Sequence, residues 1–394
     1  MKLTFTGDAM CEYRRLETYF DKKKEQYDFE EIFSGLGKFL KKSNYVVANL
    51  ETPLAGKEYK YSYKNFSFNT PSEFAEAMLN SGIKMVTTAN NHVLDRGIGG
   101  LRHTIQELDR IGIEHTGSFS CADKAYPLIK EIDGIKIAFL SYTYGTEACF
   151  NHNYLKRTER YCVNLLREQE LRNPIRRFFL TNPALIAKCF RFIYRILSPQ
   201  NARKSPSDRW EKDRLQKEKF VKDIEFCRTC GAEYIILCLH CGGQFNKKPT
   251  EYTRNVCAFA RKNGVDFVIG NHEHCIQMYD EKNQIAYSLG NLTSDYAIER
   301  GPFDRLAEYS ILFHLYLKRN NSEIEKKCAF SIVKSVKNQQ GKIVSRLVSD
   351  IYENSNPIEK DKMLKDVRKC IQIFLDKEIN YLEIKDEYQI SEFF

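Results

Sequence analysis

The sequence predicts an α/β fold in which strands and helices alternate along most of the chain. Short β-rich apolar runs are separated by segments with helical periodicity. Polar residues follow the ends of the predicted strands, where α/β sheets form their sites. The chain has 394 residues, 42% of them hydrophobic, which is enough to bury a sizeable core. Alternation of this kind is typical of a sheet covered by helices.

The first 150 residues contain four predicted buried strands and the helices between them. The strands are expected at 3–7, 45–51, 84–90 and 136–142, and the helices at 29–42, 72–81 and 98–110. After a basic segment the pattern resumes with a helix at 209–230, a strand at 233–240, a helix at 249–263 and strands at 266–270 and 285–290. Further strands are expected at 308–317, 329–336 and 342–349, and a charged helix at 357–377. We therefore expect one α/β domain from residues 1–150 and 215–350, with 351–394 as a C-terminal helical tail.

The positive net charge of +9 comes from one segment. Residues 156–220 contain 17 Lys and Arg against 7 Asp and Glu, which leaves 44 against 45 in the rest of the chain. This segment overlaps most of a predicted basic helical insertion at 151–214. A charge confined to one segment argues against a protein that coats nucleic acid over its whole surface.

Within this insertion, residues 171–207 lack acidic residues and alternate Arg and Lys with Phe, Ile, Leu and Tyr. Three interpretations stay open for this stretch. It is an ordinary basic hairpin packed on the domain, a helix that binds an anionic membrane surface, or a lid over an anionic substrate or nucleic-acid contact. Pro183 is expected to break any helix here in two.

The composition favours a cytoplasmic location, with a peripheral position at the inner membrane face as an extension of it. The chain has no apolar run of eighteen or more residues, and its start carries charges where a signal peptide needs an apolar stretch. Its 13 cysteines are an odd number scattered through predicted strands and helices. That distribution suits free thiols in a reducing compartment.

Five predicted strand ends each deliver a polar residue of the kind that binds metals. Taken alone, each has a structural explanation, such as a helix cap for Asp8 or a hydrogen-bonded core histidine for His240. Their shared position at one edge of a sheet instead predicts a common site. The residues are Asp8, Asn49, Glu51, Asn90, Asn91, His92, His240, His272 and His274.

The motifs around these residues resemble the CapA family of poly-γ-glutamate capsule proteins in order and spacing. They are GDAM at 7–10, ANLETPL at 48–54, TANNHVLDRG at 88–97, LHCGG at 239–243, GNHEH at 270–274 and YSLGNL at 287–292. The family looks like a divergent branch of the calcineurin-like metallophosphoesterases. The resemblance implies an α/β/β/α sandwich with two metal ions.

Carried over by position, the resemblance assigns Asp8 and His274 to one metal. It assigns Asn91, His240 and His272 to the second metal, and Glu51 to a bridging position with Asn49 beside it. Such ligands suit zinc, manganese or iron, and two ions about 3.5–4 Å apart can clamp both oxygens of an in-line displacement. His92 is placed to act as general acid, with Asp95 to orient it.

The chain also departs from the family pattern. Met10 stands where classical phosphoesterases have a histidine, so the first metal lacks an imidazole there. Cys241 and Gln244 replace a tryptophan and a glutamate, and Glu273 replaces a proline. These changes affect the expected substrate pocket more than the expected metal ligands.

Cysteines offer a competing metal site, because Cys227 and Cys230 are followed by Cys238 and Cys241. Four thiolates can hold a structural zinc ion. However, Cys238 lies inside a predicted buried strand, and only seven residues separate the pairs. We therefore expect ordinary core or surface thiols.

The expected function is that of a metal-dependent hydrolase acting on an anionic polymer or a phosphoester in capsule biosynthesis. The scissile bond is a phosphoester or a glutamyl amide, and the residues do not choose between them. The alternative is a non-catalytic scaffold of a capsule synthase at the membrane.

Overall fold

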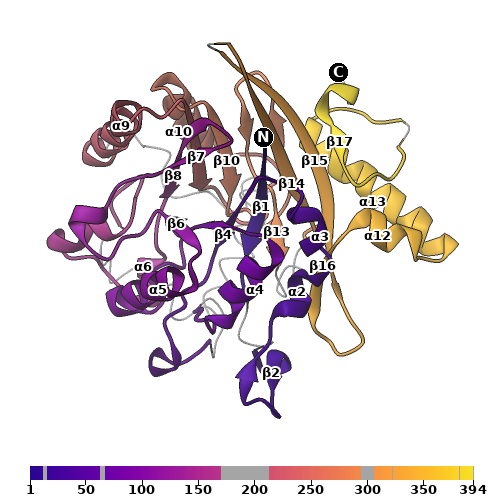
Figure 1. The fold of residues 1–394 in the computed structure, drawn as a ribbon, viewed down its shortest axis with the longest axis horizontal. Helices are drawn as coiled ribbons and strands as arrows, with labels where there is room; N and C mark the ends of the chain where they lie inside the picture. The colour runs from indigo at the N-terminus through magenta and orange to yellow at the C-terminus, as the bar shows by residue number, and fades with distance from the viewer. Residues whose placement is uncertain are drawn as a thin grey trace, which may run out of the picture.

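The computed structural model describes residues 1–11, 16–62, 67–169, 213–293, 306–321, 323–380 and 382–393. Two sheets face each other in the middle of this part of the chain (Figure 1). The larger sheet has the order β16-β15-β14-β1-β4-β5-β6, with β13 paired to β1 and β17 paired to β15. The smaller sheet has the order β11-β12-β10-β9-β8-β7.

The strands of the larger sheet come from both ends of the chain. They are β1 (Lys2–Ala9), β4 (Tyr45–Leu50), β5 (Met85–Thr87), β6 (Glu114–Thr116), β13 (Asn291–Thr293), β14 (Tyr309–Asn320), β15 (Glu323–Lys337), β16 (Ile343–Leu347) and β17 (Tyr388–Gln389). Strands β1, β4, β5 and β6 run parallel, whereas β14, β15 and β16 continue the sheet in antiparallel fashion. A short hairpin of β2 (Phe20–Asp21) and β3 (Gln26–Tyr27) stands apart.

The smaller sheet is built from the middle of the chain. Its strands are β7 (Leu128–Ile132), β8 (Ile135–Thr143), β9 (Tyr234–His240), β10 (Phe267–Asn271), β11 (Tyr279–Asp280) and β12 (Ile285–Ala286). Strands β8, β9, β10 and β12 are parallel to one another. Parallel strands bring their carboxyl ends to one edge, so this sheet also presents its strand ends together.

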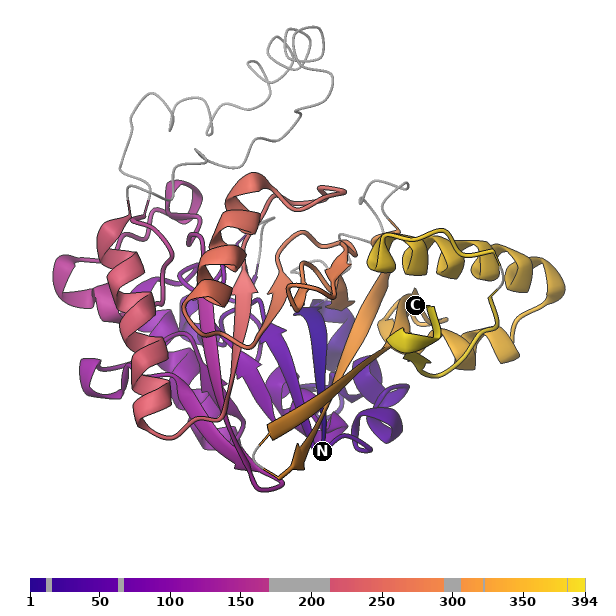
Figure 2. The same cartoon turned by 90° about the horizontal axis from the view of Figure 1, so that it is seen from above.

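Helices pack around the two sheets. They are α2 (Glu30–Ser34), α3 (Gly37–Leu40), α4 (Glu73–Ser81), α5 (Gly97–Ile111), α6 (Ala148–Asn151), α9 (Arg214–Thr229), α10 (Glu251–Lys262), α12 (Val348–Glu353) and α13 (Pro357–Leu375). Helices α2, α3 and α4 pack on the larger sheet, and α9 and α10 pack on the smaller one (Figures 1 and 2). Short 3-10 turns lie at Glu17–Tyr19, Lys57–Tyr59, Ala122–Lys124, Arg157–Cys162 and Ile390–Phe393.

The alternation of side chains along the buried strands explains the layers. In β4, Tyr45 and Val47 point into the core between the two sheets, whereas Val46 and Ala48 point to the helices outside. Successive strand residues face opposite sides, so a fully apolar strand serves two cores at once. The result is an α/β/β/α sandwich, which confirms the fold class predicted from the sequence.

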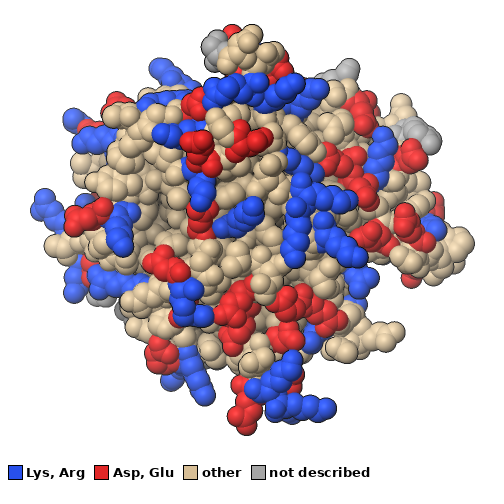
Figure 3. Space-filling view, in the orientation of Figure 1, with Lys and Arg blue, Asp and Glu red and all other residues tan. Residues whose placement is uncertain are grey.

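Figure 3 shows Lys and Arg interspersed with Asp and Glu on the face viewed there. Most of the predicted basic insertion, residues 170–212, lies outside the described residues. The described part of it, up to residue 169, joins the domain, since Val163 pairs with Ser118 and Leu165 pairs with Thr143.

Candidate metal centre

The carboxyl ends of strands from both sheets meet at one place, and the predicted ligands lie there. Asp8 is the second-to-last residue of β1, and Glu51 directly follows β4. His240 ends β9, and His272 and His274 follow β10. All five side chains are buried, with at most 7% of each residue exposed. The larger sheet thus supplies both carboxylates, and the smaller sheet supplies the imidazoles.

These residues form two groups whose possible ligand atoms lie within 4.8 Å of one another. The first group is Asp8, Glu51 and His274, and the second group is Glu51, His240 and His272. Glu51 belongs to both, which is the arrangement that the resemblance implies for a bridging carboxylate. Carboxylate and imidazole sets of this kind suit zinc, manganese and iron.

In the first group, His274 is held between a carboxylate and an amide. Its Nδ1 lies 3.3 Å from Asp8 Oδ2 and 2.9 Å from Asn291 Oδ1, while its Nε2 lies 3.8 Å from Glu51 Oε1. Burial acts to raise the pKa of Asp8, but hydrogen bonding to His274 and the charges of His240 and His274 lower it below 3.8. Asp8 is therefore an ionised carboxylate at neutral pH.

Asn291 is a site residue that the sequence reasoning did not single out. Its side chain also donates to the His274 carbonyl at 3.0 Å, and its backbone pairs with Asp8 in the sheet. An amide that fixes the second nitrogen of a metal-binding histidine orients the ring. The YSLGNL motif contained the signal, because Asn291 is its polar residue at the start of β13.

In the second group, His240 is the centre. Its Nε2 lies 2.7 Å from Asn91 Oδ1, 3.1 Å from His272 Nδ1 and 3.4 Å from Glu51 Oε1. Burial lowers the pKa of His240 to about 3, and burial also lowers the pKa of His272 well below 6.5. Both rings are therefore neutral at neutral pH, which is the form that binds metal.

Asn49 lies behind the ligands as a hub of hydrogen bonds. Its amide nitrogen donates to Asp8 Oδ1 at 2.7 Å and lies 3.2 Å from His240 Nδ1. Its oxygen accepts from Thr87 Oγ1 at 3.2 Å and from Asn90 Nδ2 at 3.3 Å. This geometry orients one residue of each group, and direct ligation by Asn49 stays a prediction.

The backbone after β10 is strained where the two histidines leave it. His272 has a φ of 110° and His274 has a φ of 56°, both in the region that favours glycine. Strain of this kind costs about 1–3 kcal/mol for each residue and gathers at functional sites. Here it turns both rings toward the carboxylates of the opposite sheet.

His92 and Asp95 form a buried pair beside the two groups. His92 Nδ1 lies 2.8 Å from Asp95 Oδ2, which also accepts from the Phe68 backbone N–H at 2.8 Å. The Phe68 ring packs on the imidazole with 4.3 Å between ring centroids. His92 directly follows Asn91, whose side chain bonds to His240, so the pair lies close to the second group.

A loop after β8, residues 144–155, forms a wall that the sequence reasoning missed. The Tyr144 ring lies 4.8 Å from the His272 ring between centroids, and Asn151 donates to Asp95 Oδ1 at 3.3 Å. We call this segment the bridging loop. No pattern in the sequence marks it, because its two contacts depend on how the loop folds back over the strand ends.

The departures from the family pattern lie close to these groups. Cys241 and Glu273 are buried, and the Met10 backbone is paired with Thr293 through bonds of 3.0 and 2.7 Å. Burial raises the pKa of Glu273 well above 4.5, and within the described residues its carboxyl oxygens have no hydrogen-bond partner. Glu273 is therefore a neutral acid, placed against Gly242.

The competing cysteine site finds no support in the described residues. The two groups above are the metal-binding groupings found there, and neither contains a cysteine. Cys227, Cys238 and Cys241 are buried, and burial raises the pKa of each thiol to about 12. They are core thiols, as expected.

The stretch 171–207, for which binding to an anionic membrane surface is one of three open interpretations, lies outside the described residues. Among the helices that the structure does describe, none is both long and apolar enough to cross a membrane.

Comparison with known proteins places these motifs in a family. The family described as "Bacterial capsule synthesis protein PGA_cap" matches residues 2–296 of the chain. The "Capsule biosynthesis protein CapA" of Bacillus anthracis is 21% identical over 317 residues, which cover 79% of this chain and 64% of that protein. The "PGA biosynthesis protein CapA" of Bacillus subtilis (strain 168) is 22% identical over 327 residues, or 82% of this chain and 69% of that protein. The matched part thus spans just under two thirds of the first relative.

Proposed function

The chain belongs to the family of bacterial capsule synthesis proteins, and from that premise we propose that it is a metal-dependent hydrolase. Its substrate is an anionic capsule polymer of the poly-γ-glutamate type, which it processes during biosynthesis. The names of the two relatives support the biological process, since one is a capsule and the other a PGA biosynthesis protein. One observation supports the chemistry above the others: carboxylates of one sheet converge on histidines of the other.

The residues fit two divalent ions. Asp8 and His274 would hold one ion, Asn91, His240 and His272 would hold the other, and Glu51 lies within reach of both groups. When bound, such ions supply Lewis-acid activation of water and of the scissile group. The chain holds its imidazoles neutral and its Asp8 carboxylate ionised, so the ligands need no change of protonation at neutral pH.

His92 supplies the proton for the leaving group. Asp95 fixes Nδ1 of the ring, so Nε2 is the nitrogen that faces proton transfer. A positioned acid of this kind contributes about 10²–10⁴-fold to the rate. Phe68 and the bridging loop hold the pair in place and keep water away from it.

Metal content and hydrolysis measured together test the proposal. Purified protein is expected to contain zinc, manganese or iron by elemental analysis, and to hydrolyse a phosphoester or a γ-glutamyl amide in a chelator-sensitive way. Asp8→Asn and His240→Gln should lose both metal and activity. His103→Gln is the matched control, because this half-buried ring bonds to the Leu54 carbonyl and belongs to neither group of potential ligands.

The outcome separates enzyme from scaffold. Protein that binds metal through Asp8 and His240 but hydrolyses neither class of bond would leave the scaffold of a capsule synthase as the function. The replacements at Cys241 and Gln244 are the features that favour that alternative. If neither Asp8→Asn nor His240→Gln lowers the metal content, the proposed metal centre is wrong.

Anionic membrane is a second partner that we propose for residues 171–207, on their composition alone. Binding to acidic vesicles that weakens with salt would support it. Equal binding to neutral and acidic vesicles, or none to either, would exclude it.

A further inference from the structure

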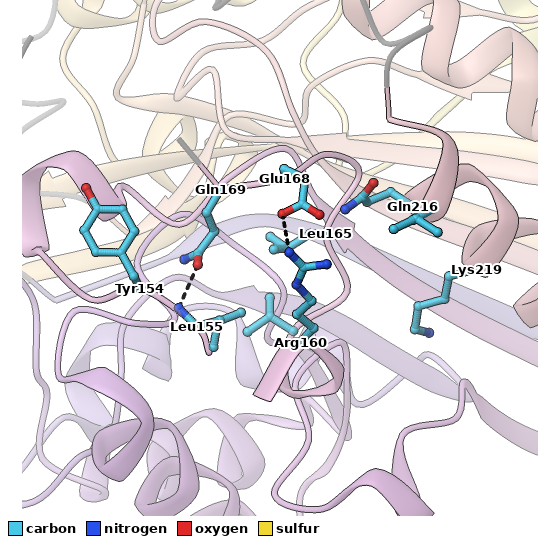
Figure 4. Close-up of a pocket in the computed structure, with 10 residues that line it drawn as sticks. Tyr154, Leu155, Arg160, Leu165, Glu168, Gln169, Gln216 and Lys219 are labelled. Carbon is cyan, nitrogen blue, oxygen red and sulfur yellow. Dashed lines mark hydrogen bonds and ion pairs between the residues drawn. The ribbon is translucent and has the colours of Figure 1, made fainter. Parts of the chain in front are cut away.

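A cavity of about 540 Å³ lies at the end of the bridging loop and shares no residue with the metal centre (Figure 4). Its walls are the end of the bridging loop, the segment that follows it and the first turns of α9. The lining residues are Tyr154, Leu155, Arg160, Val163, Leu165, Glu168, Gln169, Leu215, Gln216 and Lys219. The volume falls within the range of about 300–1,000 Å³ that is usual for ligand sites.

The lining combines three kinds of chemistry. Leu155, Val163 and Leu165 give an aliphatic wall, and glutamines contribute amides. Arg160 and Lys219 are the cations of the lining; Arg160 pairs with Glu168 of the lining, and Lys219 pairs with Asp223 at 2.7 Å. The Arg160 guanidinium meets the Glu168 carboxylate at 3.1 Å across the cavity in Figure 4. An aliphatic wall beside cations and amides suits a chain of amides that carries carboxylates on methylene groups.

The bridging loop joins this cavity to the metal centre through direct contacts. Tyr154 and Leu155 at its end line the cavity, while Tyr144 and Asn151 contact His272 and Asp95. Gln169 fastens the two parts, since its amide donates to Thr146 Oγ1 at 2.6 Å and accepts from the Leu155 N–H at 2.8 Å. The bridging loop therefore contacts both a polymer in the cavity and the residues proposed to cleave that polymer.

We propose that this cavity is a second binding site, which holds a distal stretch of a carboxylate-bearing polyamide chain. The identity of the polymer rests on the proposed function, but the cavity and its chemistry do not. Arg160 recognises a carboxylate of the chain, and the ligand competes with Glu168 for the guanidinium. The leucines and Val163 contact the methylene groups. The site extends recognition beyond the scissile bond, as suits an enzyme that acts on a long polymer.

Because the ligand competes with Glu168 for Arg160, substitutions of these two residues should change the binding affinity in opposite directions. A fluorescent γ-glutamyl oligomer is titrated into metal-stripped protein, so that binding is measured without cleavage. Arg160→Gln is expected to weaken binding about threefold to tenfold, because a charge-assisted hydrogen bond is lost. Glu168→Gln is expected to tighten binding by a similar factor, because it frees Arg160 for the ligand.

A matched ion pair elsewhere provides the control. Arg110 and Glu107 on α5 form the same kind of contact at 2.9 Å, and neither lines the cavity. Arg110→Gln and Glu107→Gln should leave the affinity of the oligomer unchanged. Thermal melting of all four variants checks that each one folds.

Three results would overturn the proposal: changes of the same sign for Arg160→Gln and Glu168→Gln, equal changes in the control pair, or tighter binding of an uncharged amphiphile than of the oligomer. These results differ from a failure of the proposed function. A protein that binds metal and cleaves a small substrate, yet shows no signed response, loses only the second site. A protein that shows the signed response without metal or cleavage keeps the second site and loses the hydrolase.

Discussion

His92 is held in one orientation by Asp95 and Phe68, and this rigidity gives it a role separable from metal binding. Replacing His92 by Ala is expected to leave metal content near wild type and to lower turnover about 10²–10⁴-fold on a substrate with a poor leaving group. The loss should shrink with a good leaving group such as nitrophenol, whose oxygen needs little protonation. Turnover on both substrates and elemental analysis check this.

Asp8→Ala provides the contrast to His92→Ala. It should deplete metal and abolish turnover on both substrates, because Met10 adds no imidazole to the first group. If His92→Ala loses metal as badly as Asp8→Ala, then His92 is a ligand and the general-acid role is wrong.

Gly7 allows the close approach that places Asp8. A Cβ at this position would lie 2.1 Å from the Gly290 carbonyl oxygen, which accepts the Asp8 N–H at 2.9 Å. Gly7→Ala is expected to push these strands apart, to cost about 1–3 kcal/mol of unfolding free energy and to reduce metal content. Urea unfolding and elemental analysis measure both effects. Gly145→Ala, which meets no atom within 4 Å, should change neither.

The positions of the site residues followed from the sequence because each one ends a strand, and strand ends of parallel sheets gather. The hydrogen-bond roles did not follow. Asn49 lies near the end of β4 and Asn91 follows β5, yet Asn91 lies 2.7 Å from His240 Nε2 while Asn49 bonds to Asp8 and His240. That difference depends on side-chain direction, which spacing alone does not carry. Direct metal ligation by any of these residues stays a prediction.

At the scale of elements, long apolar strands and strongly periodic helices were predicted well. Strand 233–240 corresponds to β9 (Tyr234–His240), and helix 98–110 corresponds to α5 (Gly97–Ile111). The predicted helix at 29–42 is wrong in extent, since the chain forms α2 and α3 with a break at Gly35 and Leu36. The spacing of its apolar residues is compatible both with one long helix and with two short helices that pack on the same sheet, so the sequence does not distinguish them.

Strands after residue 285 were predicted least well. The expected strand 285–290 is only Ile285–Ala286, because Leu289 and Gly290 instead make isolated bridges that lead the chain to the other sheet. The expected strand 329–336 is part of β15 (Glu323–Lys337), whose first half is charged and exposed. Pairing with β14 over its whole length extends it beyond the apolar run.

Helix α13 and strand β17 belong to the core rather than hanging from it. Val367, Ile371 and Phe374 are fully buried against the cluster between the sheets, and β17 pairs with β15. Deleting residues 357–394 is expected to prevent stable folding, since each such side chain contributes about 1.5–3 kcal/mol against a usual net stability of about 5–15 kcal/mol. Circular dichroism melting and dye binding to exposed apolar surface measure this.

Two point changes in α13 sharpen the test. Phe374→Ala should cost about 3–5 kcal/mol. Ile358→Ser, at a side chain that is 83% exposed, should be close to neutral. A truncated protein that melts like the full chain would mean that the segment is a detachable tail.

At the scale of the whole molecule, buried neutral histidines make the fold sensitive to acid. Burial lowers the pKa of His314 well below 6.5, and its ring bonds to Thr4 Oγ1 at 2.8 Å and Ser331 Oγ at 2.9 Å. The unfolded chain then binds more protons than the native state below about pH 6.5. Stability is therefore full above this pH and is lost as the pH falls, by roughly 1 kcal/mol per pH unit for each such histidine.

Unfolding by urea between pH 5 and 8 measures this slope in metal-free protein. His314→Gln keeps an amide between Thr4 and Ser331 but cannot titrate, so its slope should be shallower than that of wild type. His152→Gln, at an exposed position, should retain the full slope. Parallel slopes for His314→Gln and wild type would show that His314 titrates normally.

Metal ions at this site would tie the two sheets together, since each group takes ligands from both. Adding manganese or zinc to chelated protein is expected to raise the melting temperature, with about 2.7 kcal/mol of stabilisation at 100 times the dissociation constant. Differential scanning fluorimetry measures the shift, and Asp8→Asn should abolish it. A shift that persists in Asp8→Asn would place the ion elsewhere.

Strand β1 lies in the middle of the larger sheet, between β4 from the first fifty residues and β14 from beyond residue 308. Contacts this distant in the sequence slow folding, because a long loop must close before they form. During synthesis, the first strand leaves the ribosome long before its partner Tyr309–Asn320 exists. The edge of β1 that pairs with β14 therefore stays unpaired until β14 is synthesised, and unpaired strand edges are prone to pair with other chains. A cell that makes this protein must protect the nascent chain until its last strands emerge.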